Sequence, residues 1–246
     1  MKINEIFFSI QGEGIYTGEK MLFIRTEYCN LRCSWCDTKY SFNEGYSMTI
    51  EEILNKIEYY RKNNNFNWLC ITGGEPLLQK DLNGLIKKLY KKYKILLETS
   101  GSLNIKRFLP LYNLVYKDID FKLPSSSMYN KFNYNNLRYL KKGDYIKFVI
   151  NDENDFNTAI KEIENINIET QFIIQPVWDS NVGYKCHNYR RNSNKYHIRN
   201  NLHKKQKLNN IYKYYQYEIC KFGQFRNKSF SGGSRNMAFT WFRAGQ

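Results

Sequence analysis

The sequence predicts an α/β fold whose strands form a parallel sheet, either open or barrel-like. The first observation is an alternation, up to residue 177, of short β-rich runs with stretches of helical hydrophobic period. The second is the order of these runs, because strands separated by helices pair in parallel. The third is size: 246 residues indicate one domain or at most two, and such a chain buries a core without disulfides.

Six strand candidates and three helix candidates make up this pattern. The strands are expected at residues 21–26, 68–72, 95–98, 114–121, 145–150 and 171–177. Thr49 and Glu52 have the spacing of a capping box and open the first helix. Asp81 opens the second helix, and Asp152 or Asn154 opens the third. The apolar faces of these helices consist of Ile50, Ile53, Leu54 and Ile57, then Leu82, Leu85, Ile86 and Leu89, then Phe156, Ile160 and Ile163.

The positive charge is confined to the last quarter of the chain. The formal net charge is +15, which taken alone suggests a nucleic-acid binder. Residues 1–184 carry 24 basic and 22 acidic side chains, whereas residues 185–246 carry 14 basic side chains and a single acid. The sequence therefore predicts a nearly neutral domain at 1–184, followed by a basic C-terminal segment at 185–246.

The C-terminal segment also loses the apolar pattern. It contains five Ile or Leu, no Val and no Pro, and it is rich in Asn, Lys, Arg and Tyr. Three interpretations compete: a basic, partly disordered arm that contacts nucleic acid, a divergent but folded tail, or a sequence not selected for this fold, such as a shifted reading frame. The abrupt change favours the third. Function is therefore inferred from residues 1–184, and a nucleic-acid partner is not expected.

Hydropathy and the N-terminal sequence bear on location. No window of about 18 apolar residues exists, which excludes a membrane span. Residues 1–5 run into structured-looking sequence without an apolar secretory core, so a cytoplasmic location is expected. In that compartment the six cysteines are reduced thiols or metal ligands rather than disulfides.

Three cysteines lie within eight residues, directly after the first strand candidate. Cys29, Cys33 and Cys36 form a C-x₃-C-x₂-C run, and soft thiolates of this kind bind iron–sulfur clusters, zinc or Cu(I). A structural zinc site needs four ligands, but Cys70 lies 34 residues further on and all three His lie in the C-terminal segment. A [4Fe-4S] cluster held by three cysteines leaves one iron open for a small ligand. The alternative is three buried or incidental thiols.

A Gly-Gly-Glu-Pro segment at 73–76 ends the second strand candidate. Paired glycines let the backbone approach a bound group closely, and a carboxylate accepts hydrogen bonds from an ammonium. Taken alone, this segment fits a simple strand-to-helix turn equally well. It follows the cysteines after about 37 residues and one helix candidate, as a βαβ unit requires.

Together the two motifs resemble those of the radical S-adenosylmethionine (SAM) enzymes. In that superfamily SAM chelates the open iron, and an aromatic residue, here Trp35, typically precedes the third cysteine. Residues 5–14, EIFFSIQGEG, closely resemble the opening of the 7-carboxy-7-deazaguanine synthases of the queuosine pathway. Further similar segments follow in order at 23–26, 36–38, 97–101, 118–126 and 174–177. The resemblance covers roughly residues 3–184.

The resemblance implies a fold, a reaction and cofactors. The fold would be a partial (β/α) barrel of about six parallel strands, with the cluster at the C-terminal mouth of the strands. The reaction would convert 6-carboxy-5,6,7,8-tetrahydropterin to 7-carboxy-7-deazaguanine and ammonia. The cofactors would be a [4Fe-4S] cluster, SAM and Mg²⁺. The expected partners are the pterin substrate, an external electron donor such as flavodoxin or ferredoxin, and a second copy in a homodimer.

The resemblance also assigns residues, none of them as a side-chain acid or base, because the radical arises at the cluster and SAM. Cys29, Cys33 and Cys36 would hold the cluster. SAM would contact Trp35, Asp37, Gly74, Asp120, Phe121 and Lys122. The substrate would contact Ile10, Gln11, Gly12, Arg25, Thr72 and Glu98. Thr38 matches the Mg²⁺ ligand of the family, and a hydroxyl is a hard oxygen donor suited to that ion.

Each assignment has a structural alternative. Arg25 would pair with the substrate carboxylate or be a surface or salt-bridged residue. Thr38 would otherwise be a turn hydroxyl, residues 120–122 a strand end and residues 11–14 a flexible turn. Cys70 is interpreted as a small core residue. The C-terminal substrate contact of the family cannot be assigned, because no proline follows Pro176 and residues 201–204 resemble that segment only faintly.

Two other functions remain open from the sequence. One is a basic nucleic-acid-binding protein with a structural metal site. The other is a radical SAM activase that acts on a partner protein.

Overall fold

The computed structural model describes residues 1–179 and 183–184, and the unit Met1–Val177 contains the whole predicted α/β pattern. Its strands are β1 (Lys2–Ile10), β2 (Lys20–Thr26), β3 (Tyr46–Ser47), β4 (Trp68–Gly73), β5 (Lys94–Thr99), β6 (Tyr116–Phe121), β7 (Tyr145–Ile150) and β8 (Gln171–Pro176). Its α-helices are α1 (Ile50–Asn63), α2 (Leu82–Leu89), α3 (Ile105–Phe108) and α4 (Glu153–Asn165).

Short 3₁₀ turns complete this unit: η1 (Gly14–Tyr16), η2 (Lys39–Phe42), η3 (Pro76–Leu78), η4 (Tyr112–Leu114), η5 (Pro124–Ser126), η6 (Tyr129–Lys131) and η7 (Tyr134–Tyr139). Two further strands, β9 (Trp178–Asp179) and β10 (Gly183–Tyr184), follow this unit in the chain and pair with each other in antiparallel fashion.

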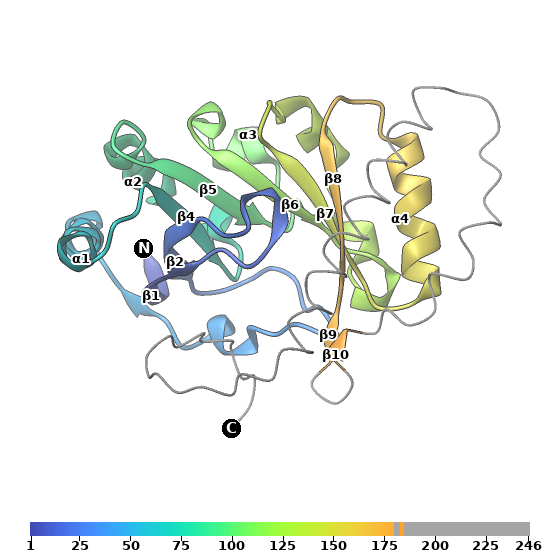
Figure 1. The fold of residues 1–246 in the computed structure, drawn as a ribbon, viewed down its shortest axis with the longest axis horizontal. Helices are drawn as coiled ribbons and strands as arrows, with labels where there is room; N and C mark the ends of the chain where they lie inside the picture. Colours follow the sequence, from blue (N-terminus) through green and yellow to red (C-terminus); the bar gives the residue numbers. More distant parts are fainter. Residues whose placement is uncertain (180–182, 185–246) are drawn as a thin grey trace, which may run out of the picture. The chain divides into compact units, whose positions relative to one another are not determined.

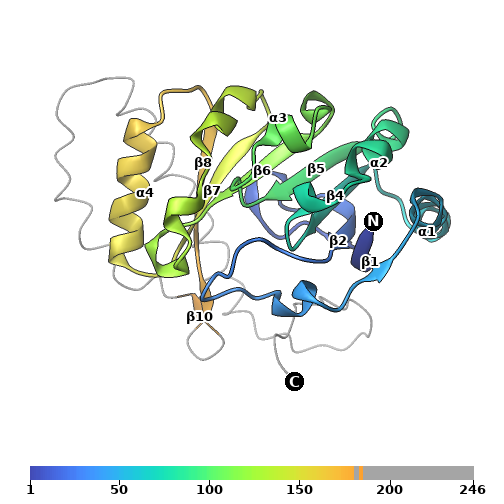
Figure 2. The same ribbon diagram turned by 180° about the vertical axis from the view of Figure 1, so that it is seen from behind.

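One eight-stranded sheet runs through the unit in the order β3-β1-β2-β4-β5-β6-β7-β8. The six strands from β2 to β8 pair in parallel and follow one another across Figures 1 and 2. The end strands β3 and β8 do not pair with each other, so the sheet stays open in the described part of the chain. The predicted fold, about six parallel strands in a partial barrel, is confirmed.

The N-terminal edge of the sheet was not predicted. β1 pairs with β2 and β3 in antiparallel fashion, so it adds a meander to the parallel core. The strand expected at 114–121 begins only at Tyr116, because η4 occupies the preceding residues. The other five expected strands match the observed ones to within one residue at each end.

The helix starts were predicted with mixed success. Thr49 caps α1 in a complete capping box with Glu52, and Asp152 caps α4 by accepting from the backbone N–H of Asp155 at 2.8 Å. Asp81 stands at the start of α2, but its side chain makes no capping bond. Its carboxylate instead lies 3.4 Å from the amino-terminal nitrogen of Met1. Asp81 therefore precedes α2 as predicted, but its side chain does not cap the helix.

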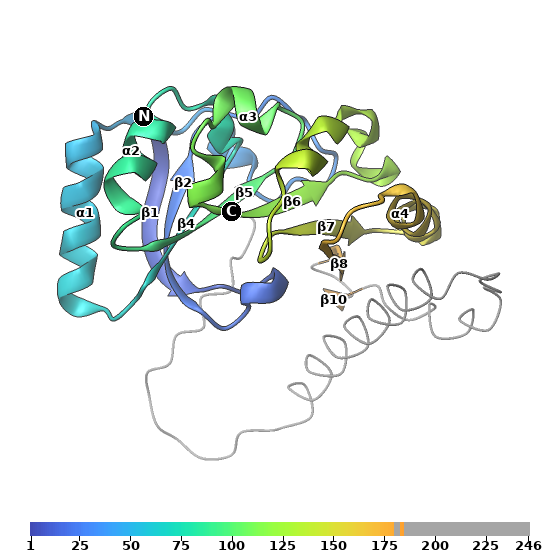
Figure 3. The same ribbon diagram turned by 90° about the horizontal axis from the view of Figure 1, so that it is seen from above.

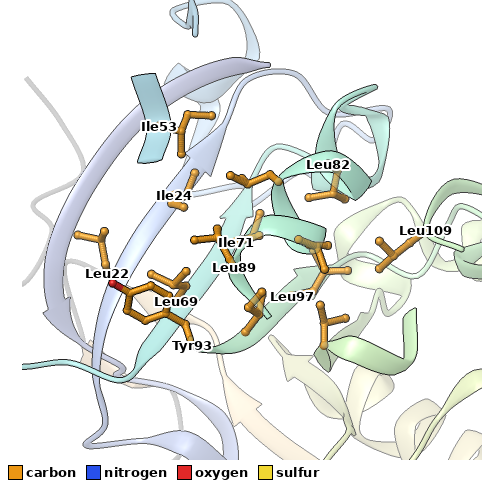
Figure 4. Close-up of a cluster of buried hydrophobic side chains, with 14 of the residues drawn as sticks. Leu22, Ile24, Ile53, Leu69, Ile71, Leu82, Leu89, Tyr93, Leu97 and Leu109 are labelled. Carbon is orange, nitrogen blue, oxygen red and sulfur yellow. The ribbon is translucent and has the colours of Figure 1, made fainter. Parts of the chain in front are cut away.

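One face of the sheet carries the apolar core. Figure 3 shows α1 and α2 along the outside of the sheet. Figure 4 shows the buried hydrophobic side chains that pack where these helices meet the sheet. Fully buried members include Leu22, Ile24, Ile53, Leu69, Ile71, Leu82 and Leu97. Alternate residues of each strand point to opposite faces, so this core leaves the other face of the same strands for a different use.

Residues 1–177 contain no helix with the length and apolarity that a membrane span requires. The predicted basic segment, 185–246, lies outside the described residues, and so do the three His and the segment 201–204.

Candidate active site

Polar and charged side chains collect on the face of the sheet opposite the helices. Residues in register on neighbouring parallel strands share a face, and Arg25 of β2 pairs with Thr72 of β4. Glu98 of β5 pairs with Asp118 of β6 in the same way, and Asp120 of β6 pairs with a residue of β7, Lys147. Buried parallel strands normally carry continuous apolar runs, so this row of charges is a candidate site rather than core.

The loops that follow the parallel strands hold one another at one edge of this face. Asn30, after β2, donates to Ser102, after β5, at 2.9 Å. The backbone N–H of Ser34, also after β2, donates to the carbonyl of Ser126, after β6, at 3.0 Å. The carboxyl ends of parallel strands are where ligands bind in open and closed α/β sheets.

The cysteine run occupies the loop between β2 and η2. Cys29, Cys33 and Cys36 are half-buried and form no disulfide. The hydroxyl of Thr38, the residue matched to Mg²⁺, lies 3.6 Å from the sulfur of Cys36. Asp37 is exposed beside them. The loop therefore carries all three predicted thiols, and it places the hydroxyl of Thr38 next to Cys36.

A single metal ion and a cubane cluster make different demands on the three thiols. Within the described residues, no group of three His, Cys, Asp or Glu is arranged to hold one metal ion. A cubane cluster makes a different demand, because each thiolate binds a separate iron. Burial, aided by the charges of Glu75, Cys33 and Cys36 and opposed by the backbone N–H of Leu31, raises the pKa of the Cys29 thiol to about 11. Loading must therefore displace protons from neutral thiols.

The glycine pair lets the end of β4 lie against the chain that enters the cysteine loop. Gly73 has φ +130°, and a Cβ on Gly74 would lie 2.0 Å from the carbonyl oxygen of Tyr28. The N–H of Gly74 donates to the carbonyl of Thr26 at 2.9 Å, and the N–H of Glu75 donates to that of Tyr28 at 2.8 Å. A side chain at either glycine would push the two loops apart.

Glu75 connects the loops after β4 and β5. Its buried carboxylate accepts from the N–H and the hydroxyl of Ser100, from the hydroxyl of Thr99 and from the N–H of Leu77. A carboxylate has about four acceptor positions, and all four are used here. A bound ammonium could therefore reach this carboxylate only by displacing one of these donors.

The residues expected around SAM do not all face the same way. The ammonium of Lys122 pairs with Asp120 at 2.8 Å and lies 5.0 Å from the ring centroid of Trp35. Phe121 points to the other face, where it packs in an aromatic cluster that includes Phe132 at 4.3 Å between ring centroids. Only the backbone of Phe121 is therefore available to a ligand on the polar face.

Two of the residues expected around the substrate, Gln11 and Arg25, each bind a carboxylate of the protein. The buried Gln11 amide donates to the carboxylate of Glu98 at 2.8 Å, which joins the loop after β1 to β5. Arg25 Nε binds the carboxylate of Glu5 at 2.7 Å, so the salt-bridged alternative for Arg25 is also present. Thr72 is buried beside Arg25, a Cβ on Gly12 would meet no atom within 4 Å, and Ile10 is half exposed at the end of β1.

A buried ammonium at the centre of the face was missed by the sequence reasoning. Lys147 lies 2.8 Å from the carboxylate of Glu13, 3.2 Å from Asp118 and 4.0 Å from Asp120. Burial alone would lower the pKa of Lys147, but the attraction of Asp118, Glu13, Asp120 and Glu98 raises it well above the ordinary value. Its signal in the sequence was a lysine inside an otherwise apolar strand, 145–150.

Asp118 predicts a pH dependence of stability. Burial raises the pKa of Asp118 to about 7, with Glu98 and Asp120 adding to the rise and Lys147 opposing it. The folded state therefore binds a proton that the unfolded state releases between about pH 4 and pH 7, and the free energy of unfolding falls as pH rises through this window.

The test compares the wild type with Asp118→Asn, which cannot take up this proton. From pH 5 to pH 8 the variant should gain on the order of 2 kcal/mol of unfolding free energy relative to the wild type. Urea unfolding at the two pH values measures this change. A difference between the two proteins that stays constant with pH would contradict the assignment.

Known proteins share both the sequence pattern and the fold. The family model of the radical SAM superfamily matches residues 23–151. A 7-carboxy-7-deazaguanine synthase of Thermoplasma acidophilum is 42% identical over 183 residues, which cover 74% of this chain and 85% of that protein. One of Clostridium acetobutylicum is 37% identical and covers 72% and 81% of the two chains.

A solved structure supports the same fold. The crystal structure of QueE from Escherichia coli has a TM-score of 0.59 at 24% identity, covering 72% of this chain and 84% of that chain. This structure shows the likeness in fold, and the identity and coverage of the sequence relatives show the family. This chain belongs to the radical SAM superfamily and, within it, to the family of 7-carboxy-7-deazaguanine synthases.

Proposed function

We propose that this protein converts 6-carboxy-5,6,7,8-tetrahydropterin to 7-carboxy-7-deazaguanine with release of ammonia. One observation carries the proposal: a three-cysteine loop borders a buried polar sheet face in a chain 42% identical to an enzyme named for this product. The reaction balances as a loss of one ammonia, so the protein needs no net oxidant or reductant beyond the catalytic electron.

The proposal includes a [4Fe-4S] cluster on Cys29, Cys33 and Cys36, SAM beside Trp35, and Mg²⁺ at Thr38. When bound, the cluster and SAM supply the radical that removes hydrogen from the substrate. The chain supports this with soft thiol donors at a half-buried loop and a hydroxyl next to them. It also includes an external electron donor such as flavodoxin or ferredoxin, a homodimer and a cytoplasmic location.

The residues on the sheet face would orient the pterin. The carboxylate of Glu98, fixed by the amide of Gln11, would accept from the guanidine-like edge of the ring. Arg25, whose Nε is fixed by Glu5, would contribute positive charge to the substrate carboxylate. Preorganised groups of this kind cost little reorganisation when substrate binds.

The charge of the face supports cationic ligands. The four carboxylates of Glu5, Glu13, Glu98 and Asp120, together with Asp118 when it is ionised, share the face with three cationic groups, of Arg25, Lys122 and Lys147. Both the sulfonium of SAM and Mg²⁺ would gain from this excess of negative charge in a partly buried site.

The test is an anaerobic assay of the full chain. The protein is reconstituted with iron and sulfide, reduced, and given SAM, Mg²⁺ and 6-carboxytetrahydropterin, and the deazaguanine product is followed by mass spectrometry. Product that requires all components supports the proposal. SAM cleavage without deazaguanine would overturn the substrate assignment, and radical transfer to a polypeptide would support an activase instead. Absence of both cluster and cleavage would overturn the radical chemistry.

A further inference from the structure

The segment around the third cysteine is held by the loop after β6. Residues 28–38 form no helix or strand, so side-chain and backbone bonds must fix their position. The hydroxyl of Ser34 donates to the carbonyl of Ser125 at 2.5 Å, and the indole N–H of Trp35 donates to the hydroxyl oxygen of Ser125 at 3.0 Å. Ser125 is therefore a contact for both residues that precede Cys36.

Asp155 accepts two hydrogen bonds from Ser125. One oxygen of this fully buried carboxylate accepts from the N–H of Ser125 at 3.0 Å, and the other accepts from its hydroxyl. The second oxygen also accepts from the N–H of Asn151 at 3.0 Å. Asp152 already caps α4, so Asp155 is not needed to begin this helix.

The direction of these bonds is determined by chemistry. An indole N–H can only donate, and an ionised carboxylate can only accept. The hydroxyl of Ser125 must therefore give its single proton to Asp155 and turn a lone pair toward Trp35. An amide in place of Asp155 would turn its NH₂ group either toward the N–H of Ser125 or toward the Ser125 hydroxyl and the N–H of Asn151, and either orientation loses at least one of these bonds.

We propose that Asp155 and Ser125 are positioning residues for Trp35, and that they orient its indole beside the third cysteine for SAM. The ammonium of Lys122, 5.0 Å from the ring centroid, restrains the ring through a cation–π contact. The hydrogen bond to Ser125 restrains rotation of the Trp35 indole within the plane of its ring. The part of this inference that concerns SAM rests on the proposed function, whereas the orientation of the indole does not.

The first test needs neither cofactor nor substrate. The chain contains four Trp, and Trp35→Phe assigns the Trp35 indole N–H in a ¹⁵N-labelled spectrum of the apoprotein. Ser125→Ala and Asp155→Asn should shift this signal and raise its hydrogen-exchange rate at least about tenfold, because the acceptor is lost or misdirected. Ser34→Ala is the matched control: it removes a neighbouring hydroxyl bond to the same serine, and the indole signal should keep its protection.

The second test uses the reconstituted enzyme. Trp35→Phe and Ser125→Ala should each raise the KM for SAM in uncoupled SAM cleavage several-fold. The double variant should match Trp35→Phe alone, because Ser125 then has no indole N–H left to accept from. Multiplying effects, or an indole signal unchanged in Ser125→Ala and Asp155→Asn, would overturn the inference. If the wild type cleaves SAM but forms no deazaguanine, the proposed function fails while the indole result still decides this inference.

Discussion

Replacing Cys33 with alanine is expected to abolish cluster loading and deazaguanine formation while leaving the fold intact. Cys33 lies half-buried in an irregular loop, so its truncation should change the free energy of unfolding by no more than about 1 kcal/mol. Its thiolate would be one of only three protein ligands of the cluster, and the fourth cysteine among the residues that the structure describes, Cys70, is buried in β4. Iron content, visible absorption and product mass measure the loss.

Cys70 provides the matched control for this prediction. It is fully buried inside β4 and does not belong to the loop after β2, so it is not expected to bind iron. Cys70→Ala should therefore load iron like the wild type, although its sulfur is 4.0 Å from the Gln11 amide. Full iron loading of Cys33→Ala, or loss of iron in Cys70→Ala, would contradict the assignment of the three loop cysteines.

The parts of the fold that could be predicted are those that depend on local sequence patterns. The strand at 145–150 was predicted to the residue, because an apolar run between a Gly-Asp turn and an Asp cap has a local signature. The cysteine run is local for the same reason, since its chemistry depends on spacing alone. β1 was missed because it pairs in antiparallel fashion next to the edge strand β3, with a pattern of partly buried residues that does not mark a core strand.

The contacts that organise the site are long-range and could not be read in this way. Lys147 meets Glu13 across 134 positions of the chain, and Asp155 meets Ser125 across 30. The sequence does show charges where a parallel strand should be apolar, at Asp118 and Lys147, and this mismatch was the available signal. Which carboxylate would meet the lysine depended on the register of β6 and β7.

The same mismatch appears on the other face of β6, where Lys117 forms a fully buried ion pair with Asp144. The ammonium lies 2.7 Å from the carboxylate, and both side chains are 0% exposed. Asp144 also accepts from the backbone N–H groups of Lys117 and Lys141, at 2.9 and 2.8 Å. This pair therefore joins β6 to the turn before β7.

Breaking the pair from one side is expected to destabilise the protein by about 3–5 kcal/mol, because it leaves a buried charge without its partner. Lys117→Met leaves the carboxylate, and Asp144→Asn leaves the ammonium while keeping one acceptor oxygen for the backbone. Urea unfolding of the full apoprotein, followed by circular dichroism in the far ultraviolet, measures both changes.

The double variant, Lys117→Met with Asp144→Asn, distinguishes the effect of an unpaired buried charge on the free energy of unfolding from the effect of altered packing. Burial lowers the pKa of Lys117 and raises the pKa of Asp144, so for each group the cost of desolvation exceeds the attraction of its partner. A pair with this balance contributes little net stability, whereas each charge alone is costly. The double variant should therefore be more stable than either single variant, with a coupling of roughly 2 kcal/mol or more in the double-mutant cycle. Additive losses would show instead that the two side chains act through their separate backbone bonds, the carbonyl of Tyr112 for Lys117 and the N–H groups for Asp144.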